Sequence, residues 1–571
     1  MIYLGLDTET INGSCRLLCL SDGSVFKMKS IYDVKRFLKK WQGQDFIAFN
    51  ADYDIQALIK YLPRNIIDLL LKGITAEYDG ITMVYIPDKF FKFNDNVIYD
   101  CYQFYHMGLD RAAKKYLGKG KGAVDAAQIT EANIYTDKVI KYCIRDAKLV
   151  AELFSTFREA LPDSVKDVPP LSNAYYSGKY FADELRSNRG IELRVNKQFR
   201  GAYHGARNEI FERGHYPDGL YYYDISGAYP YEIALLPSMK NPFVIDSKAY
   251  APDADFSIYR VQAFIDNKFV SPVLMKTQTL SVYPGGFFDG LVTKPEYERI
   301  KDYPHKILAA SHIGQRSKYC PFKSKIDELW ALRKTVSNPM PVKIIMNSLY
   351  GKMASAVPKW QKSPGGMGAC LDIEWARNGK IYYLVEDLFH SNFVYASHIT
   401  AKVRCRMYDI VNEFPDDIVA VQTDSVMSKR PLPLRISDRL GDWKVEKWDE
   451  AYVLGSGVYF FRIGDEWQGK FRGFDFPKDR LLSVMKALLS SEKTRIEFPS
   501  KRRVSLQESR RIKDDSLANI IMDATKKLDI NFDKKRLWES CWLSGREIRT
   551  KRIKSIALFH YRPELQLSLG I

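Results

Sequence analysis

The 571-residue chain lacks several features that would assign it to other classes of protein. No apolar run approaches the ~20 residues that a membrane-spanning helix needs. The first ten residues, MIYLGLDTET, contain neither the basic region nor the apolar core of a signal peptide. Internal repeats and low-complexity tracts are also missing. We therefore expect a cytoplasmic protein without a membrane partner, folded into two to four domains.

Cysteine is present but forms no pattern. The eight residues include no CxxC pair, which argues against structural zinc and a disulfide framework and favours reduced thiols. They are Cys15, Cys19, Cys101, Cys143, Cys320, Cys370, Cys405 and Cys541.

Acidic residues do not balance the basic ones. The 86 Lys and Arg against 69 Asp and Glu give a net charge of +17, which favours a polyanionic partner, most often nucleic acid. Basic runs gather late in the chain, at 499–503, 508–513 and 546–554. These runs can be solvated helix faces or phosphate-binding surfaces. We expect the last ~100 residues to be mostly helical.

Short apolar strands alternate with helical stretches over the first ~150 residues, which is typical of an α/β domain. Further on, the sequence predicts a helix pair at 323–335 and 342–354, because prolines in the connection end one helix and start the next. A hairpin is expected over 370–387 with Asn378-Gly379 at its tip. A long helix over 396–414 then leads into an apolar strand.

Acidic and aromatic side chains recur at the ends of elements in the first domain. Asp7 and Glu9 share one strand face, and paired carboxylates repel each other unless a cation such as Mg²⁺ lies between them. A surface strand end is the alternative. Asp54 follows a second apolar strand, and Tyr142 and Asp146 share one helix face. A tyrosine one turn from an aspartate can orient a metal-activated water.

These residues resemble the exonuclease motifs DxE, Nx2–3(F/Y)D and YxxxD of proofreading DNA polymerases of family B. The resemblance implies an RNase H-like domain with a two-metal 3′–5′ exonuclease. Its implied metal ligands are Asp7, Glu9, Asp54 and Asp146, assisted by Tyr142, and its implied contacts to the single strand are Thr10, Asn50 and Tyr53. The expected lysine is either Lys119 or Lys121. The family's Ser-Leu element corresponds to Cys101-Tyr102.

A second pair of carboxylates lies in the later half. Asp224 ends the apolar strand LYYY, and Asp424 lies within the strand run VAVQTDSVMS, 419–428. Two carboxylates from neighbouring strands, with the Ile225 carbonyl, can hold two Mg²⁺ ions roughly 4 Å apart. These three residues are therefore candidate metal ligands.

One helix stripe carries a cation, an amide and an aromatic ring. Lys343, Asn347 and Tyr350 are spaced i, i+4, i+7, and Gly351 would allow a close approach. This set suits a nucleoside triphosphate, with the lysine neutralising phosphate. A plain amphipathic helix is the alternative.

The stretches DISGAYP, KIIMNSLYG and QTDS resemble the family B polymerase motifs DxxSLYP, KxxxNSxYG and DTDS. The resemblance implies an α/β and α+β multidomain chain, in which the exonuclease precedes a right-hand palm, fingers and thumb. It implies a DNA-directed DNA polymerase that uses primer–template DNA, dNTPs and two Mg²⁺ per site, with Mn²⁺ as a substitute. Tyr229 would lie under the deoxyribose, and Arg333 or Lys334 would bind the γ-phosphate.

Three positions depart from these motifs. The expected motif serine is Gly227, with Ser226 one place early, and the first aspartate of DTDS is Gln422. The KxY element has Gly457 in place of its lysine. This leaves Tyr459 to meet the primer, and Lys470 and Arg472 are candidates to bind its phosphate, so all three are expected DNA contacts.

The stretch AYHGA, 202–206, resembles the YxG(G/A) signature between the two modules, with Tyr203, Gly205 and Ala206 as DNA contacts. The short chain resembles the compact protein-primed phage and viral enzymes. That resemblance implies a monomer in the host cytoplasm, a terminal protein as primer, strand displacement, and two insertions around the fingers. The hairpin at 370–387 lies where the second insertion would be, although it could merely extend the palm sheet.

The implied domain order is as follows: exonuclease 1–185, linker 186–210, first palm part with an insertion 211–325, fingers 326–354, hairpin insertion 355–392, second palm part 393–478 and basic thumb 479–571. Two alternatives stay open. One is a primer-independent, nucleic-acid-primed or RNA-copying polymerase of the same fold. The other is a polymerase-derived nuclease or DNA-binding protein with an impaired palm, which Gln422 and Gly227 would favour.

Overall fold

The computed structural model describes residues 3–122, 124, 128–277, 280–315, 319–355, 373–377, 380–383, 390–474, 478–490, 492, 494–530, 534–539 and 544–560. The chain divides into two compact units. Unit 1 comprises Met1–Tyr180, Leu329–Ser348 and Pro499–Lys526, and unit 2 comprises Phe181–Glu328, Leu349–Phe498 and Lys527–Ile571. No helix in the described part of the chain is long and apolar enough to cross a membrane.

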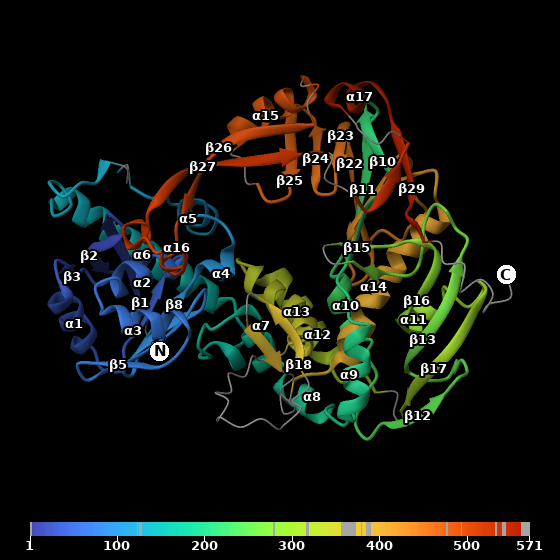
Figure 1. Cartoon of the computed structure of the whole chain (residues 1–571), viewed down its shortest axis with the longest axis horizontal. Helices are drawn as coiled ribbons and strands as arrows, with labels where there is room; N and C mark the ends of the chain where they lie inside the picture. Colours follow the sequence, from blue (N-terminus) through green and yellow to red (C-terminus); the bar gives the residue numbers. More distant parts are fainter. Residues whose placement is uncertain are drawn as a thin grey trace. The chain divides into compact units, whose positions relative to one another are not determined.

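Unit 1 is built on an eight-stranded sheet of order β3-β2-β1-β4-β8-β7-β6-β5, drawn in blue in Figure 1. Its parallel centre is β1 (Tyr3–Ile11), β4 (Asp45–Ala48) and β8 (Asn96–Asp100). The outer strands are β2 (Ser14–Leu20), β3 (Val25–Lys27), β5 (Ala76–Tyr78), β6 (Ile81–Ile86) and β7 (Phe90–Phe93). The strands and the α/β pattern predicted for this region are confirmed.

Helices cover the sheet of unit 1. They include α1 (Ile31–Lys40), α2 (Ala51–Ile59), α3 (Arg64–Leu71), α5 (Leu109–Leu117) and α6 (Asp137–Glu159). Helix α6 lies so close to β1 that a Cβ on Gly5 would come within 1.9 Å of the Ala147 carbonyl oxygen. Close packing here brings Asp146 of α6 beside Asp7 and Glu9 of β1.

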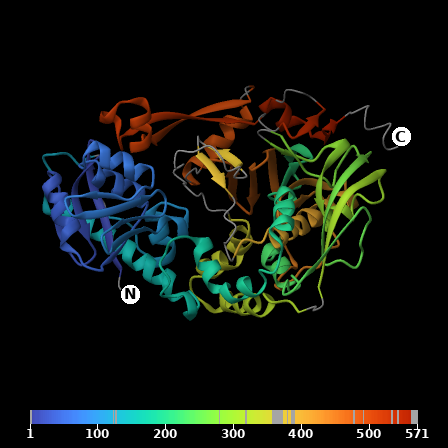
Figure 2. The ribbon, with the colours of Figure 1, turned by 60° about the horizontal axis from the view of Figure 1, so that its bottom comes forward.

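A C-terminal segment completes unit 1. Strands β26 (Arg495–Arg503) and β27 (Ile521–Asp529) form a two-stranded ribbon, and α16 (Leu506–Ile512) follows β26. We call Pro499–Lys526 the tip segment; Figures 1 and 2 both show its α16 beside the N-terminal domain. Leu506 and Ala518 are buried in the same core cluster as the strands of that domain.

Unit 2 contains the five-stranded sheet β22-β11-β21-β20-β9. Its strands are β9 (Arg207–Ile210), β11 (Leu220–Ile225), β20 (Ile418–Thr423), β21 (Ser425–Ser428) and β22 (Trp443–Trp448). The predicted long helix is α14 (Phe393–Glu413), which is buried along most of its length. After β11 the chain turns into α10 (Ala228–Ala234).

Two more sheets belong to unit 2. One has the order β25-β24-β23-β10-β29-β28, from β10 (Glu212–Tyr216), β23 (Glu450–Gly455), β24 (Val458–Ile463), β25 (Glu466–Phe471), β28 (Arg536–Trp538) and β29 (Ile553–Ala557). The other has the order β12-β17-β13-β16-β30, from β12 (Phe243–Ser247), β13 (Phe256–Ile265), β16 (Gly285–Thr293), β17 (His305–Gly314) and β30 (Phe559–His560). The second sheet is almost wholly encoded between β11 and the predicted helix pair.

The predicted helix pair is α12 (Lys323–Thr335) and α13 (Met340–Met353), which confirms the expectation. The predicted hairpin is confirmed in its backbone, because β18 (Ile373–Arg377) pairs antiparallel with β19 (Lys380–Tyr383). Its Asn378-Gly379 tip, Cys370 and most of 355–392 lie outside the described residues.

The expectation of a mostly helical C-terminus is wrong. Besides α15 (Lys478–Ser490), α16 and α17 (Gly545–Thr550), the region forms β26 to β30. The stretch RIEFPSKRR alternates partly buried Ile496 and Phe498 with exposed neighbours, which is the period of a strand. Its basic residues hid this alternation, because charge runs fit either kind of element.

Candidate active sites

Four acidic side chains of unit 1 come from three elements. Asp7 and Glu9 lie on β1, Asp54 lies on α2, and Asp146 lies on α6. Single ligand atoms of Asp7, Glu9 and Cys143 all lie within 4.8 Å of one another. The alternation of β1 therefore brings the two carboxylates together, as predicted from the DTE sequence. Sequence reasoning did not include Cys143, which donates its thiol proton to the Asp7 carbonyl at 3.5 Å.

Hydrogen bonds and an ion pair orient this cluster. Thr8 Oγ1 donates to Asp54 Oδ1 at 2.5 Å. Lys121 Nζ lies 2.6 Å from Asp146 Oδ2 and donates to the Tyr142 hydroxyl at 3.4 Å. Lys119 instead pairs with Glu152, at 2.6 Å. The structure thus separates the two lysines that the sequence left open, and it is Lys121 that joins the cluster.

Three carboxyl groups of the cluster, those of Asp7, Glu9 and Asp54, have raised pKa values. Burial, and then the Asp54, Glu9 and Asp146 charges, raise the pKa of Asp7 well above its usual value. Burial first raises the pKa of Glu9 to about 7 and that of Asp54 to about 7. The one ammonium group of Lys121 does not balance four acidic side chains, and their oxygen donors suit a hard divalent cation. The residues present therefore fit the metal that the resemblance implies.

The predicted single-strand contacts border this cluster. Thr10 Oγ1 and the Tyr53 hydroxyl are hydrogen-bonded at 2.5 Å. Asn50 precedes α2 in the left-handed conformation, with φ of 62°, and its N–H donates to Asp100 Oδ1 at 2.9 Å. Cys101 is buried, whereas its neighbour Tyr102 is exposed.

The second carboxylate pair lies on adjacent strands of unit 2. Strand β11 pairs antiparallel with β21, so that Asp224 stands opposite Ser425 and next to Asp424. The Ile225 N–H donates to the Asp424 carbonyl at 3.1 Å. Thr423 has a φ of 60°, which makes the tight β20–β21 turn that presents Asp424. The prediction that these two aspartates share one sheet is confirmed.

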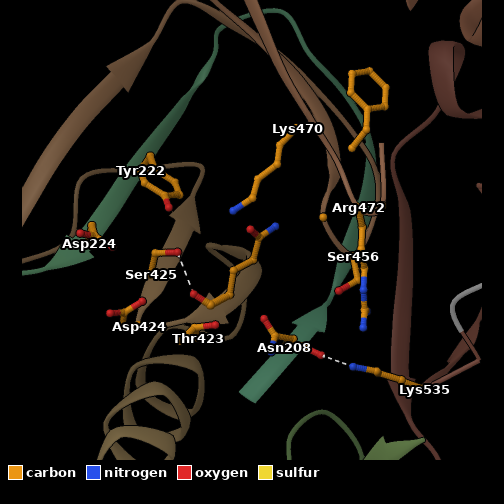
Figure 3. Close-up of a pocket in the computed structure, with 14 residues that line it drawn as sticks. Asn208, Tyr222, Asp224, Thr423, Asp424, Ser425, Ser456, Lys470, Arg472 and Lys535 are labelled. Carbon is orange, nitrogen blue, oxygen red and sulfur yellow. Dashed lines mark hydrogen bonds between the residues drawn. The ribbon is translucent and has the colours of Figure 1, made fainter. Parts of the chain in front are cut away.

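Both aspartates line a pocket of about 700 Å³ (Figure 3). Lys470 extends its ammonium group into the middle of this pocket, and Arg472 lines the same wall. Lys535 also lines it and donates to the Asn208 carbonyl at 3.0 Å. Four lining residues outside the motifs were not predicted from the sequence: Asn208, Tyr222, Ser456 and Lys535. Only Lys535 had a signal in the sequence, the general basic character of the C-terminal region.

Two tyrosines form a stacked pair near these acids. The rings of Tyr229 and Tyr350 are 4.5 Å apart between centroids and 18° from parallel. Burial is the main cause that raises the pKa of both hydroxyls, and the Asp424 charge raises each further, after the Tyr350 hydroxyl in the case of Tyr229. Tyr350 lies on the same stripe of α13 as exposed Lys343 and half-buried Asn347. The predicted stripe is thus the more exposed side of this helix.

The structure explains one departure from the family motifs. Gly457 has a φ of +71° in the β23–β24 turn, where a lysine would be strained. Lys470 stands directly opposite Tyr459 across β24 and β25 and enters the pocket. Tyr459 itself is 4% exposed and stacks on Trp448, so its ring belongs to the core rather than to the pocket lining.

The remaining predicted residues have separate surroundings. Gly227 has a φ of +66° at the start of α10, and the buried Ser226 hydroxyl has no hydrogen-bond partner among the described residues. Arg333 and Lys334 lie in the last turn of α12 over the Trp330 ring, at 5.3 and 5.7 Å.

The linker signature surrounds a buried arginine. Arg404 Nη1 donates to the carbonyls of His204 and Gly205, at 2.7 and 3.1 Å, and Nη2 donates to Glu296 at 2.6 Å. The Tyr203 ring lies 6.0 Å from that of Phe393. Ala206 follows this loop directly before β9. The signature is therefore held by α14 through side-chain contacts.

Comparisons with known proteins agree with the motifs. Residues 119–362 match the family model described as DNA polymerase type B, organellar and viral. The chain is 24% identical over 580 residues to the DNA polymerase of Acidianus bottle-shaped virus (isolate Italy/Pozzuoli), covering 90% of this chain and 82% of the relative.

Solved structures share the fold. Phi29 DNA polymerase complexed with primer-template DNA and incoming nucleotides superposes with a TM-score of 0.66 at 17% identity, covering 92% of this chain and 99% of that one. The same enzyme complexed with single-stranded DNA gives a TM-score of 0.65 at 17% identity and the same coverage. This confirms the expected fold class, a mixed α/β multidomain chain with the fold of that polymerase. The family model over residues 119–362, the viral relative and the shared fold together support the resemblance of this chain to family B DNA polymerases of the compact viral type.

Proposed function

We propose that the chain is a DNA-directed DNA polymerase with a 3′–5′ exonuclease, acting on primer–template DNA and dNTPs. The observation that carries the proposal is the junction of Asp224 and Asp424 at adjacent strand ends, in one pocket with Lys470 and Arg472. Nucleotidyl transfer needs carboxylates for divalent cations and basic groups for phosphate. The viral relative is named a DNA polymerase, and the Phi29 structure contains primer-template DNA and nucleotides, which supports the same partners.

In the polymerase site, Asp224, Asp424 and the Ile225 carbonyl would hold two Mg²⁺, with Mn²⁺ as a substitute. When bound, these ions lower the pKa of the primer 3′-hydroxyl and neutralise the triphosphate. Lys470 and Arg472 bind the primer phosphates beside them. Gln422 carries no charge and therefore remains outside the ligand set.

The nucleotide would rest on Tyr229 and Tyr350, whose stacked rings offer a flat surface for sugar and base. Lys343 and Asn347 extend the same helix stripe toward phosphate and sugar, and Gly351 leaves room for a close approach. The further roles proposed from the resemblance are γ-phosphate binding by Arg333 or Lys334, triphosphate contact by Ser226, and DNA contact by Tyr203, Gly205 and Ala206. The family's primer contact at Tyr459 is not proposed, because this ring is buried against Trp448.

In the exonuclease site, Asp7, Glu9, Asp54 and Asp146 would hold the two divalent ions. The Tyr142 hydroxyl would orient the attacking water. We assign the expected lysine to Lys121, because it contacts both Asp146 and Tyr142. The 3′ end of the single strand would be held by Thr10, Asn50 and Tyr53.

Protein priming and strand displacement are the finer part of the proposal. They are supported by the two inserted elements that the resemblance implies: the β12–β17 sheet before α12 and the β18–β19 hairpin after α13. The proposal includes the domain order expected from the sequence, from the exonuclease at 1–185 to the thumb at 479–571. The enzyme would act as a monomer, with a terminal protein as partner.

Extension of a labelled primer–template with Mg²⁺ and dNTPs tests the polymerase. We expect the wild type to extend the primer and Asp424→Ala to lose this activity. Priming is tested by incubating the enzyme with a labelled dNTP and candidate proteins of the same genome. Replacement of 361–387 by a Gly-Ser loop tests displacement: open templates should still be copied while a blocking strand stops synthesis. Absence of extension by the folded protein would contradict the whole proposal; long displacement products from the loop variant would contradict the role of the hairpin.

A further inference from the structure

The tip segment, Pro499–Lys526, is anchored to unit 1 by both polar and apolar contacts. The Leu506 N–H donates to Gln56 Oε1 at 2.8 Å, and Lys60 Nζ donates to the Ala518 carbonyl at 2.9 Å. Asn519 Nδ2 donates to the Tyr53 carbonyl at 3.2 Å. Leu506 is buried in the core that also contains Leu6 and Ile55. The tip is therefore part of the exonuclease-type domain, although it lies about 450 residues later in the sequence.

One cation of this segment lies over Tyr53, a residue that borders the acidic cluster. Arg503, the last residue of β26, places its guanidinium carbon 5.8 Å from the centroid of the Tyr53 ring. The hydroxyl of the same ring is hydrogen-bonded to Thr10, which follows Glu9. Arg503 thus contacts the Tyr53 ring, and Tyr53 and Thr10 are two of the residues proposed to hold the strand end.

This guanidinium has unused hydrogen-bonding capacity. Its Nη1 atom is buried and has no hydrogen-bond partner among the described residues. No described carboxylate lies within ion-pair distance of it, whereas Arg502 pairs with Glu508 at 2.6 Å and Arg510 pairs with Asp515 at 2.7 Å. The Asp52 carboxylate interacts with Arg503 electrostatically without forming an ion pair, and its Oδ1 accepts instead from the Tyr85 hydroxyl and the Asp88 N–H. A half-buried guanidinium without a direct ion pair costs free energy that a ligand anion would offset. Its planar fork matches the oxygens of a phosphate.

We propose that Arg503 binds a backbone phosphate of the single strand whose 3′ end enters the carboxylate cluster. The inference rests on the proposed exonuclease, and it adds a substrate-binding residue that no exonuclease motif contains. The ligand is a phosphodiester of single-stranded DNA a short distance from the terminus. Tyr53 positions the arginine from one side, and the tip segment positions it from the other.

The test combines Arg503→Ala with substrates in which one phosphate is replaced by a neutral methylphosphonate. For the variant we expect a KM for single-stranded DNA about tenfold higher with kcat within about twofold, and a salt dependence reduced by about one phosphate. One methylphosphonate position near the 3′ end should weaken the wild type to the same extent and leave Arg503→Ala unaffected. Arg503→Lys should recover part of the loss. Arg502→Ala is the matched control, since it removes the neighbouring charge from an exposed position.

Three results would overturn the inference: an unchanged KM in Arg503→Ala, an equal loss in Arg502→Ala, or methylphosphonate effects that are the same in both proteins. If the role of Arg503 is purely structural, Arg503→Ala should lower the melting temperature, and the methylphosphonate at that position should weaken the wild type and Arg503→Ala equally. If the wild type degrades no single strand at all, the proposed exonuclease fails instead. The inference is then decided by binding of a labelled single strand to the Asp7→Ala/Glu9→Ala protein with and without Arg503→Ala.

Discussion

Tyr229 is the single residue whose side chain most directly predicts substrate choice. It is 7% exposed and stacked on Tyr350. A 2′-hydroxyl on the incoming sugar would clash with this fixed ring. We therefore expect Tyr229→Val to raise ribonucleotide incorporation relative to dNTP incorporation on the order of tenfold or more. Competitive single-nucleotide incorporation measures the ratio. Tyr221→Val, on the preceding strand, is the control, and an unchanged ratio in Tyr229→Val would exclude this residue as the gate.

Gln422 contributes to the β20–β21 turn through its backbone. Its carbonyl accepts from the Asp424 N–H at 2.7 Å and from Ser425 Oγ at 2.9 Å. Because these contacts do not use the amide side chain, Gln422→Ala should lower the extension rate by no more than about twofold, and Gln422→Asp should stay active. Steady-state extension compared with Asp424→Ala checks this. A loss as deep as that of Asp424→Ala would give Gln422 a direct role in the reaction.

The raised pKa values of Glu9 and Asp54, each about 7, predict how stability depends on pH. The folded protein keeps these protons up to about pH 7, whereas the unfolded chain releases them near pH 4. In EDTA the free energy of unfolding should therefore fall as pH rises from about 4 to about 7. Mg²⁺ should offset the loss at pH 8 by replacing the protons.

Thermal unfolding of the whole protein in EDTA between pH 5 and pH 8 measures this effect. Asp54→Asn should flatten the profile, because it removes one of the groups whose proton is released. Asp163→Asn, a surface substitution, should leave the profile unchanged. A melting temperature that rises over this range in EDTA would contradict the role of these carboxyl groups.

The sequence alone predicted which acidic residues lie together, but it did not predict which cationic residues lie beside them. Asp7, Glu9 and Asp424 stand at strand ends inside recognisable patterns, so period and motif together predicted their grouping. Lys119 and Lys121 lie in the same GKGKG run, and only the folded loop distinguishes them. There, the Lys121 N–H donates to Asp110 at 2.9 Å, which fixes the direction of that residue. Arg503 could not be found because its partner lies about 450 residues away.

At the scale of elements, the β23–β24 turn replaces a family lysine with a glycine. Gly457→Lys would restore the motif letter, but its Cβ would lie 3.2 Å from Arg472 Cβ at a φ of +71°. We expect a destabilisation of about 1 kcal/mol, with no gain in extension. Lys470→Ala should instead raise the KM for primer–template roughly tenfold.

Chemical denaturation and primer-extension kinetics measure the two effects. Lys447→Ala, an exposed lysine on β22 whose ammonium donates to the Asp218 carbonyl, is the matched control for Lys470→Ala. If Gly457→Lys proves more active and Lys470→Ala proves neutral, the primer phosphate is bound elsewhere.

Helices and strands with a clear period of apolar residues were predicted from the sequence. Elements whose apolar residues pack only against distant parts of the chain were not. The helices α6, α12 and α14 follow from apolar spacing and proline punctuation. The β26–β27 ribbon was missed because its partly buried residues, such as Ile496, are few and are flanked by charge. Its tip gains a core only by packing Leu506 and Ala518 into the N-terminal domain. No local pattern reports such a contact.

At the scale of the whole molecule, the two carboxylate clusters belong to different compact units. Asp7 and Glu9 lie in unit 1, and Asp224 and Asp424 lie in unit 2. The sequence predicted an exonuclease module followed by a polymerase module, and this order stays a prediction. The units share the chain in turns, because Leu329–Ser348 and Pro499–Lys526 join the N-terminal unit. Two cores with separate chemistry should still lose their activities independently.

Primer extension and single-strand degradation, measured on the same set of purified variants, test this account most directly. Asp424→Ala should abolish extension and leave degradation intact, and Asp7→Ala with Glu9→Ala should do the reverse. Asp416→Ala and Asp163→Ala, exposed acids of the two units, should keep both activities. A single substitution at any of these carboxylates that removes both activities from a folded protein would contradict the assignment of two separate active sites.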